Sequence, residues 1–196
     1  MFRSSAVKLA LLLAAGVASS PLISAEDLAI DAQRSTITIH VGKAGLFSAA
    51  GHEHWISAPI SSGALRESPD PHVEFAVETA KMAVKPDPKV DTKTQAAVQK
   101  DMEEMTLETR KFPEIKFHSS AIARVGDDQW KVSGNLSLHG VTKPVSLIVK
   151  RSGDAYSAHT VLKQTDFGIK PISVGGGTIK VKNEVEIDFQ IFPRHK

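Results

Sequence analysis

The sequence predicts an all-β protein, an antiparallel barrel of about eight strands with one inserted helix. Apolar and polar residues alternate along most of the chain, the period-2 pattern of strands that bury one face. Turn-forming clusters, such as Gly126-Asp127-Asp128, Gly140 to Pro144 and Ser152-Gly153-Asp154, separate these segments. Closure into a barrel is favoured because it removes exposed strand edges.

The alternation is clearest at the end of the chain. Apolar residues from Ile179 to Ile191 fall on one face of the last expected strand, and polar residues, most of them charged, fall on the other. Asn183 interrupts the apolar face, which a polar contact, a β-bulge or a bound water would each explain. The expected strands lie near residues 36–41, 73–77, 115–117, 130–138, 145–149, 156–162 and 179–191.

One segment has helical periodicity. Thr92 and Gln95 have the spacing of a capping box, and Asp91 is an alternative cap. Met102 and Met105 then fall on the same predicted helical face. These methionines either pack in the core or form an adaptable lining for a flexible ligand, and a helix across a barrel mouth would do both.

The first 25 residues have the pattern of a secretory signal peptide. Arg3 and Lys8 precede the apolar run Leu9–Val17, and small residues lead to Ala25. The run is too short to span a membrane, which takes about 20 apolar residues. A buried N-terminal helix is the alternative, but the run has no amphipathic period. Cleavage after Ala25 would leave one domain, residues 26–196, outside the cytoplasmic membrane and not integral to it.

The composition excludes several classes of protein. Removal of Arg3 and Lys8 with the signal leaves 22 basic and 22 acidic residues, so no electrostatic case exists for binding nucleic acid or an anionic membrane. The absence of Cys excludes disulfides, thiol catalysis and cysteinyl metal sites. No Gly-x-Ser-x-Gly motif is present, and no carboxylate pair stands out for acid/base catalysis. We therefore expect a non-enzymatic protein without a cofactor.

Four segments resemble the YceI-like family. Phe112–Phe117 is similar to its "Y/F-P-x-I-x-F" segment, Val132–Val145 to its "V-x-G-x-L-T-I-H-G-V-T-K-P-V" hairpin, and Asp166–Ile169 to its "D-F-G-I" segment. Gly51–Trp55 looks like the family's "S-G-H-x-H" variant. The resemblance implies an extended, lipocalin-like barrel of the bacterial periplasm that holds a polyprenyl lipid or an isoprenoid quinone.

His52 and His54 are the residues most suggestive of chemistry. On a strand they would share a face with Ile56. They could bind a metal only with a third ligand, for which the candidates are His40, His118, His139 and His159. Alternatively they hydrogen-bond across the barrel mouth, or meet a polar head group such as a quinone carbonyl. We favour the head group, because apolar ligand pockets commonly carry a few convergent polar groups.

The alternating apolar residues would form the wall of a ligand cavity, although the same pattern fits a filled core. The predicted ligand-binding residues are Ile37, Ile39, His52, His54, Ile56, Val73, Phe75, Met102, Met105, Phe117, Trp130, Leu136, Val181, Val185, Ile187 and Phe189. We thus expect an exported carrier of a polyisoprenoid lipid or quinone, a monomer or a dimer. The alternative function is a metal- or cofactor-binding redox accessory protein that uses His52 and His54.

Overall fold

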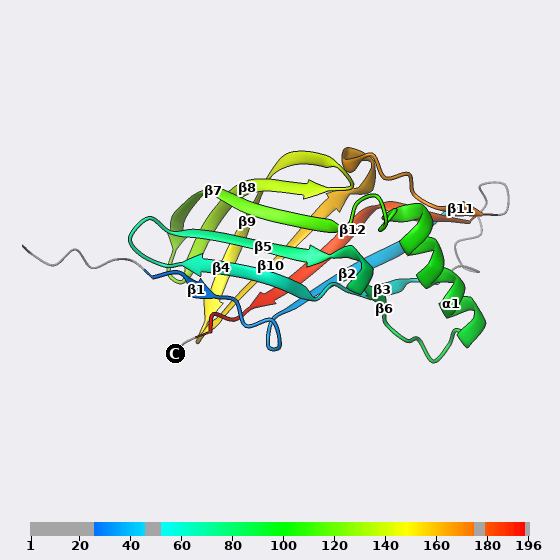
Figure 1. Cartoon of the computed structure of the whole chain (residues 1–196), viewed down its shortest axis with the longest axis horizontal. Coiled ribbons are helices and arrows are strands. Elements are labelled where there is room, and N and C mark those ends of the chain that lie inside the picture. Colours follow the sequence, from blue (N-terminus) through cyan, green and yellow to red (C-terminus); the bar gives the residue numbers. More distant parts are fainter. Residues whose placement is uncertain (1–25, 46–51, 175–178, 195–196) are drawn as a thin grey trace, which may run out of the picture.

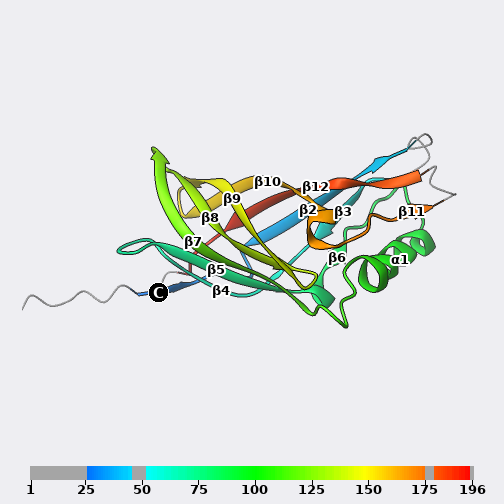
Figure 2. The same cartoon turned by 90° about the horizontal axis from the view of Figure 1, so that it is seen from above.

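Long antiparallel strands curve round into an elongated barrel, and one helix lies across one end (Figures 1 and 2). The computed structural model describes residues 26–45, 52–174 and 179–194, so the predicted signal peptide lies outside the described residues. The strands are β1 (Leu28–Ala29), β2 (Thr36–Ala44), β3 (His54–Ser57), β4 (Ile60–Arg66), β5 (His72–Glu78), β6 (Ala83–Val84), β7 (Glu114–Gly126), β8 (Gln129–Leu138), β9 (Val141–Ser152), β10 (Ala155–Lys163), β11 (Ser173–Val174) and β12 (Ile179–Ile191). The helical segments are α1 (Thr92–Asp101), η2 (Thr79–Lys81), η3 (Met102–Thr106) and η4 (Gln164–Phe167).

The pairing of consecutive short strands closes the barrel. β3 pairs with β2 and with β6, while β4, which follows β3 directly, pairs with β1 and with β5. Segment 54–66 therefore lies between segments 28–44 and 72–84 along its length. At the far side of the ring, β12 pairs with β2. The described residues form twelve separate strands, more than the eight or so that the sequence predicts. They make a ring of eight antiparallel strands when β1–β2, β3–β4 and β5–β6 are each taken as one strand and β11, which pairs only with β12, is left aside.

The β8–β9 hairpin turns more tightly than predicted. His139 and Gly140 both have positive φ, 51° and 75°, as a two-residue type I′ turn requires. The rest of the predicted turn, Val141 to Pro144, belongs to β9, where Pro144 pairs with Asn135. Pro144 is tolerated there because β9 has no partner strand on its other side at this level.

β9 and β10 diverge along most of their length. Both strands lie wholly within the described residues, and they pair only where Lys150–Ser152 meets Ala155–Ser157. Beyond that point β9 stays paired with β8, and β10 with β12. One line of the barrel wall therefore lacks a backbone ladder over most of its length.

The helix begins as one of the two predicted caps requires. The Asp91 side chain accepts a hydrogen bond from the Thr94 N–H at 3.0 Å, so Asp91 is the N-cap and the capping-box prediction for Thr92 was wrong. The Gln99 side chain fastens the helix to the barrel, because its Oε1 accepts from Val84 N–H and its Nε2 donates to Met82 O. No helix within the described residues is both long and apolar enough to cross a membrane.

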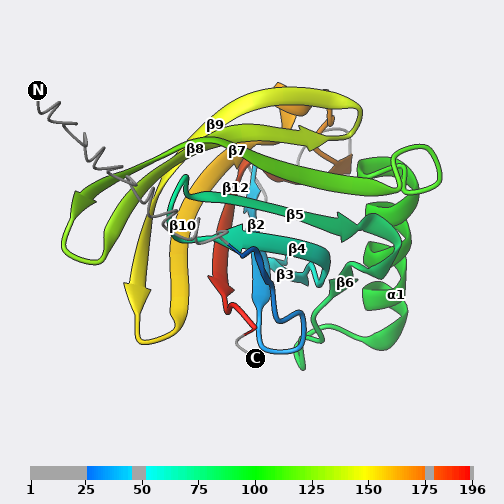
Figure 3. The same cartoon turned by 60° about the vertical axis from the view of Figure 1, so that its left-hand side comes forward.

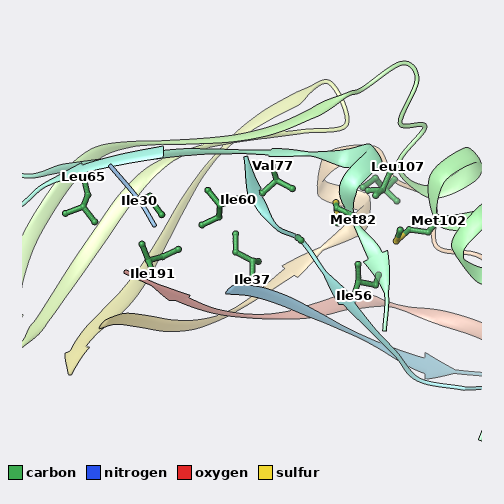
Figure 4. Packing of buried hydrophobic residues seen from close by; sticks show 12 residues of the cluster. Ile30, Ile37, Ile56, Ile60, Leu65, Val77, Met82, Met102, Leu107 and Ile191 are labelled. Carbon is green, nitrogen blue, oxygen red and sulfur yellow. The ribbon is translucent and has the colours of Figure 1, made fainter. Parts of the chain in front are cut away.

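The helix continues into a wider turn. In η3, a π-helix, the Leu107 N–H donates to Met102 O at 2.8 Å, five residues back. Leu107 consequently lies beside Met102, and Figure 4 shows both near Met82 at this end of the barrel. These three side chains are buried, so they close the helix end of the interior.

Candidate functional site: an apolar cavity

The barrel encloses a cavity of about 450 Å³, a size that falls within the usual range of small-ligand sites. Its wall is formed by the inward residues of the long strands, which alternate with outward polar ones. Among them Phe75 and Phe117 stack with their ring centroids 5.5 Å apart, and Trp130 meets Tyr156 edge-on at 6.0 Å. The interior is therefore a cavity with branched and aromatic walls rather than a filled core.

The two ends of this cavity differ. At the helix end the lining residues Met102, Leu107 and Phe167 are buried. At the opposite end, beside the β4–β5 and β9–β10 hairpins (Figure 3), the lining includes Arg66, Glu67, His72 and Arg151, which are partly exposed. We call this second end the mouth.

Three polar side chains at the mouth contact one another. The Tyr156 hydroxyl donates to Glu67 Oε1 at 2.6 Å, and Arg151 lies 3.5 Å from Glu67 Oε2. Partial burial and the neighbouring Glu67 carboxylate raise the pKa of Tyr156 well above its ordinary value. The hydroxyl therefore remains a hydrogen-bond donor at any physiological pH. We call Glu67, Arg151 and Tyr156 the mouth cluster.

Most of the predicted ligand-binding residues line this cavity. They are Ile37, Ile39, Ile56, Val73, Phe75, Met102, Phe117, Trp130, Leu136, Val185, Ile187 and Phe189. Their role in binding a ligand stays a prediction. Other lining residues, absent from the predicted set, follow the same strand alternation. Val77 continues the Val73–Phe75 series, and Leu147 lies between Val145 and Val149. Arg66, Glu67 and Arg151 carry no such signal, because they lie where strands end.

Two predicted apolar residues lie outside the lining. Met105 is 65% exposed, because the π-turn of η3 rotates it away from the face that Met102 occupies. Val181 lies beyond a register shift in β12, between Val181 and Val185. The same irregularity accounts for Asn183, whose side chain bonds to the Thr165 N–H at 3.0 Å and to its hydroxyl at 2.9 Å. Of the three explanations for Asn183, the structure shows the polar contact, at an irregularity in the register of β12 with β2.

The sequence and the fold both match known proteins. A family model, the YceI-like domain, matches residues 28–192. The chain belongs to the YceI-like family. A UPF0312 protein of Pseudomonas putida is 36% identical over 90 residues, which cover 41% of this chain and 47% of that protein. A UPF0312 protein of Shewanella denitrificans is 33% identical over 92 residues, covering 42% and 48%. The chain thus spans about half the length of these curated relatives.

Two solved structures share the fold of this YceI-like protein. BcnA of Burkholderia cenocepacia superposes with a TM-score of 0.62 at 16% identity, covering 84% of this chain and 99% of that one. A polyisoprenoid binding domain from Saccharophagus degradans gives 0.59 at 15% identity, covering 86% and 98%. At these identities the likeness concerns the fold, which confirms the prediction of an extended lipocalin-like barrel.

The histidine pair of this YceI-like protein lies outside the cavity. Ile56 of β3 and Ala58 just after it line the cavity. His54 pairs with the lining residue Val41 but is not itself part of the lining, and His52 is exposed ahead of the strand. The predicted alternation along β3 is confirmed. The assignment of His52 and His54 to a head group stays a prediction that their position outside the lining does not favour.

The candidate third metal ligands each have a carboxylate partner. His40 contacts Glu53 at 3.2 Å, His118 contacts Glu74 at 3.1 Å, and His139 contacts Glu108 at 2.8 Å. His159 contacts Asp188 at 2.9 Å. Within residues 26–45, 52–174 and 179–194, no three His, Asp or Glu side chains are grouped as a metal ion requires. The described residues therefore supply no observation that favours the redox accessory function.

The burial of His54 makes a pH dependence testable. Burial and then the neighbouring His52 lower the pKa of His54 below its usual 6.5, against a smaller opposing effect of Asp87. Because the unfolded chain binds the proton more readily, stability falls as the pH drops from about 6.5 through the lower native pKa. We expect His54→Gln to reduce the loss of Tm between pH 8 and pH 5. Thermal unfolding at both pH values checks this, and equal losses in the variant and the wild type would contradict it.

Proposed function

We propose that this protein is an exported, non-enzymatic carrier that holds an isoprenoid lipid or isoprenoid quinone inside its barrel. The cavity with its continuous apolar wall is the observation that carries the proposal. A polyprenyl chain is almost insoluble in water, and each Å² of it that the wall covers contributes about 25 cal/mol. A long chain can therefore offset the cost of being ordered in the cavity.

Two further observations support this function. One structural neighbour is described as a polyisoprenoid binding domain, and it shares the barrel over most of both chains. The N-terminal 25 residues have the pattern of a signal peptide, so the proposal places the mature protein, starting at Glu26, in the periplasm. There it would meet lipids that must leave one membrane and cross an aqueous space.

Native mass spectrometry of untagged protein from its bacterial host tests the proposal. We expect a polypeptide that starts at Glu26, with an additional mass that organic extraction identifies as a polyprenyl compound. An empty protein that carries stoichiometric metal would instead favour the redox accessory function. An empty, metal-free protein that takes up no prenyl lipid after incubation would contradict carriage.

A further inference from the structure

Polar side chains lie next to the apolar wall at the mouth of the cavity, where the binding of a purely apolar chain would not require them. Tyr156 lines the cavity beside Trp130, and its hydroxyl donates to Glu67 at 2.6 Å. Arg151 lies over the Tyr156 ring at 5.5 Å from its centroid and also contacts Glu67. Polar atoms therefore meet the apolar wall at the mouth, within reach of the end of a ligand whose chain fills the barrel.

The helix end is less suited to a polar group. Met82, Met102, Leu107 and Phe167 bury it, and the Gln164 side chain there already donates to Lys182 O at 2.7 Å. Lys163 is the one charged lining residue at that end, while the other charged or titratable lining residues gather at the mouth. A ligand with one polar end would thus retain more hydration with that end at the mouth, because a polar group buried without partners is destabilising.

The charges at the mouth are already balanced. Arg66 contacts Asp27 at 2.8 Å, and Arg151 contacts Glu67 at 3.5 Å, so each guanidinium has a carboxylate partner. A phosphate or pyrophosphate would add negative charge beside Glu67 and Asp27, where both arginines of the described lining already have carboxylate partners. An uncharged hydroxyl or carbonyl can instead share the existing donors and acceptors.

We propose that the mouth cluster, Glu67, Arg151 and Tyr156, receives the polar end of the lipid and that it takes an uncharged hydrogen-bonding head group, a hydroxyl or a quinone carbonyl, in preference to a phosphate. This inference rests on the proposed carrier function. It places the head group at the opposite end of the barrel from His52 and His54.

The two tryptophans of the chain report where the head group lies. Trp130 lines the cavity next to Tyr156, whereas Trp55 is 47% exposed, stacks on His40 with centroids 4.2 Å apart, and adjoins His54. Trp55→Phe and Trp130→Phe each leave a single emitter. A benzoquinone with a geranylgeranyl tail should quench the emission of Trp130 in the first variant and leave Trp55 in the second nearly unaffected. Geranylgeraniol, with the same tail and no quinone, is the control ligand and should quench neither.

The outcomes of this experiment distinguish the position of the head group from the proposed carriage of lipid. Quenching of Trp55 alone would place the head group at the histidine pair and overturn the inference. Bound quinone that quenches neither tryptophan would overturn it as well, while carriage would stand. Failure of both lipids to bind would overturn carriage and the inference together.

The preference for an uncharged head group has its own test. We expect wild-type protein to bind geranylgeraniol about tenfold more tightly than geranylgeranyl phosphate, a difference of about 1.4 kcal/mol. Glu67→Gln should narrow or reverse this ratio, because it frees Arg151 to meet the phosphate. Glu104→Gln, an equal charge change on the exposed face of η3 at the other end, is the matched control and should leave the ratio unchanged. Wild-type protein that prefers the phosphate, or equal ratios in the two variants, would overturn the inference.

Discussion

Replacing Leu147 with tryptophan is expected to weaken the binding of a prenyl lipid by about tenfold or more. Leu147 lies on β9 with its side chain in the cavity wall. An indole there occupies space that the lipid chain would fill, and overpacking of this kind costs about 1–3 kcal/mol. Titration of delipidated protein with geranylgeraniol measures the change.

The neighbouring residue provides the matched control. Ile148 follows on the same strand but faces outward and is 43% exposed. Ile148→Trp makes the same addition to the opposite face of the sheet, so its affinity should stay near that of the wild type. Equal losses in the two variants would show that the strand, rather than the cavity, was disturbed.

Truncation of Phe167 is expected to give a large loss of stability. Phe167 is 2% exposed, in the short helical segment η4, and it closes the cavity wall near the helix end. Gly168, with φ of 73°, ends this segment in the left-handed conformation that returns the chain to the barrel. Phe167→Ala should lower the free energy of unfolding by about 3–5 kcal/mol.

Thermal unfolding measures this loss, which corresponds to a fall in Tm of about 6–20 °C for a domain of this size. Val161→Ala is the control, because Val161 is 50% exposed on nearby β10 and its truncation should change stability by no more than about 0.5 kcal/mol. A Phe167→Ala variant as stable as the Val161→Ala variant would contradict the packing role of Phe167.

The alternation of apolar and polar residues predicted the barrel wall, because successive side chains of a strand point to opposite faces of the sheet. Ile37, Phe75 and Ile187 are far apart in the chain, yet each could be assigned to the interior from its own neighbours. The prediction failed where the local geometry changed. In η3 the hydrogen bond spans five residues, so Leu107 lies beside Met102 and Met105 is exposed. The spacing of apolar residues in the sequence does not show where such a wider turn occurs.

The mouth cluster could not be predicted from the sequence, because its assembly depends on the closed fold. Arg151 and Tyr156 face each other across the β9–β10 hairpin, but Glu67 follows β4 and meets them only when the ring closes, so no spacing along the chain relates it to them. The prediction of a polar site at His52 and His54 rested on their closeness in the sequence. The place of His54, opposite the lining residue Val41 but outside the lining itself, depends on how β3 pairs with β2, which the spacing of the two histidines does not show.

The divergence of β9 and β10 affects the range of lipid chains that the proposed carrier could accommodate. A ring laddered all the way round widens only by breaking backbone hydrogen bonds, each worth about 1 kcal/mol. In this ring, whose two diverging strands are fully described, only Lys150–Ser152 and Ala155–Ser157 are paired across that line. Along the rest of the line, lining residues such as Leu147 of β9 and Leu162 of β10 can shift without breaking a ladder. If the protein carries lipid as proposed, the width of its cavity could adjust to saturated, unsaturated or branched chains while the other seven strand pairs keep their register.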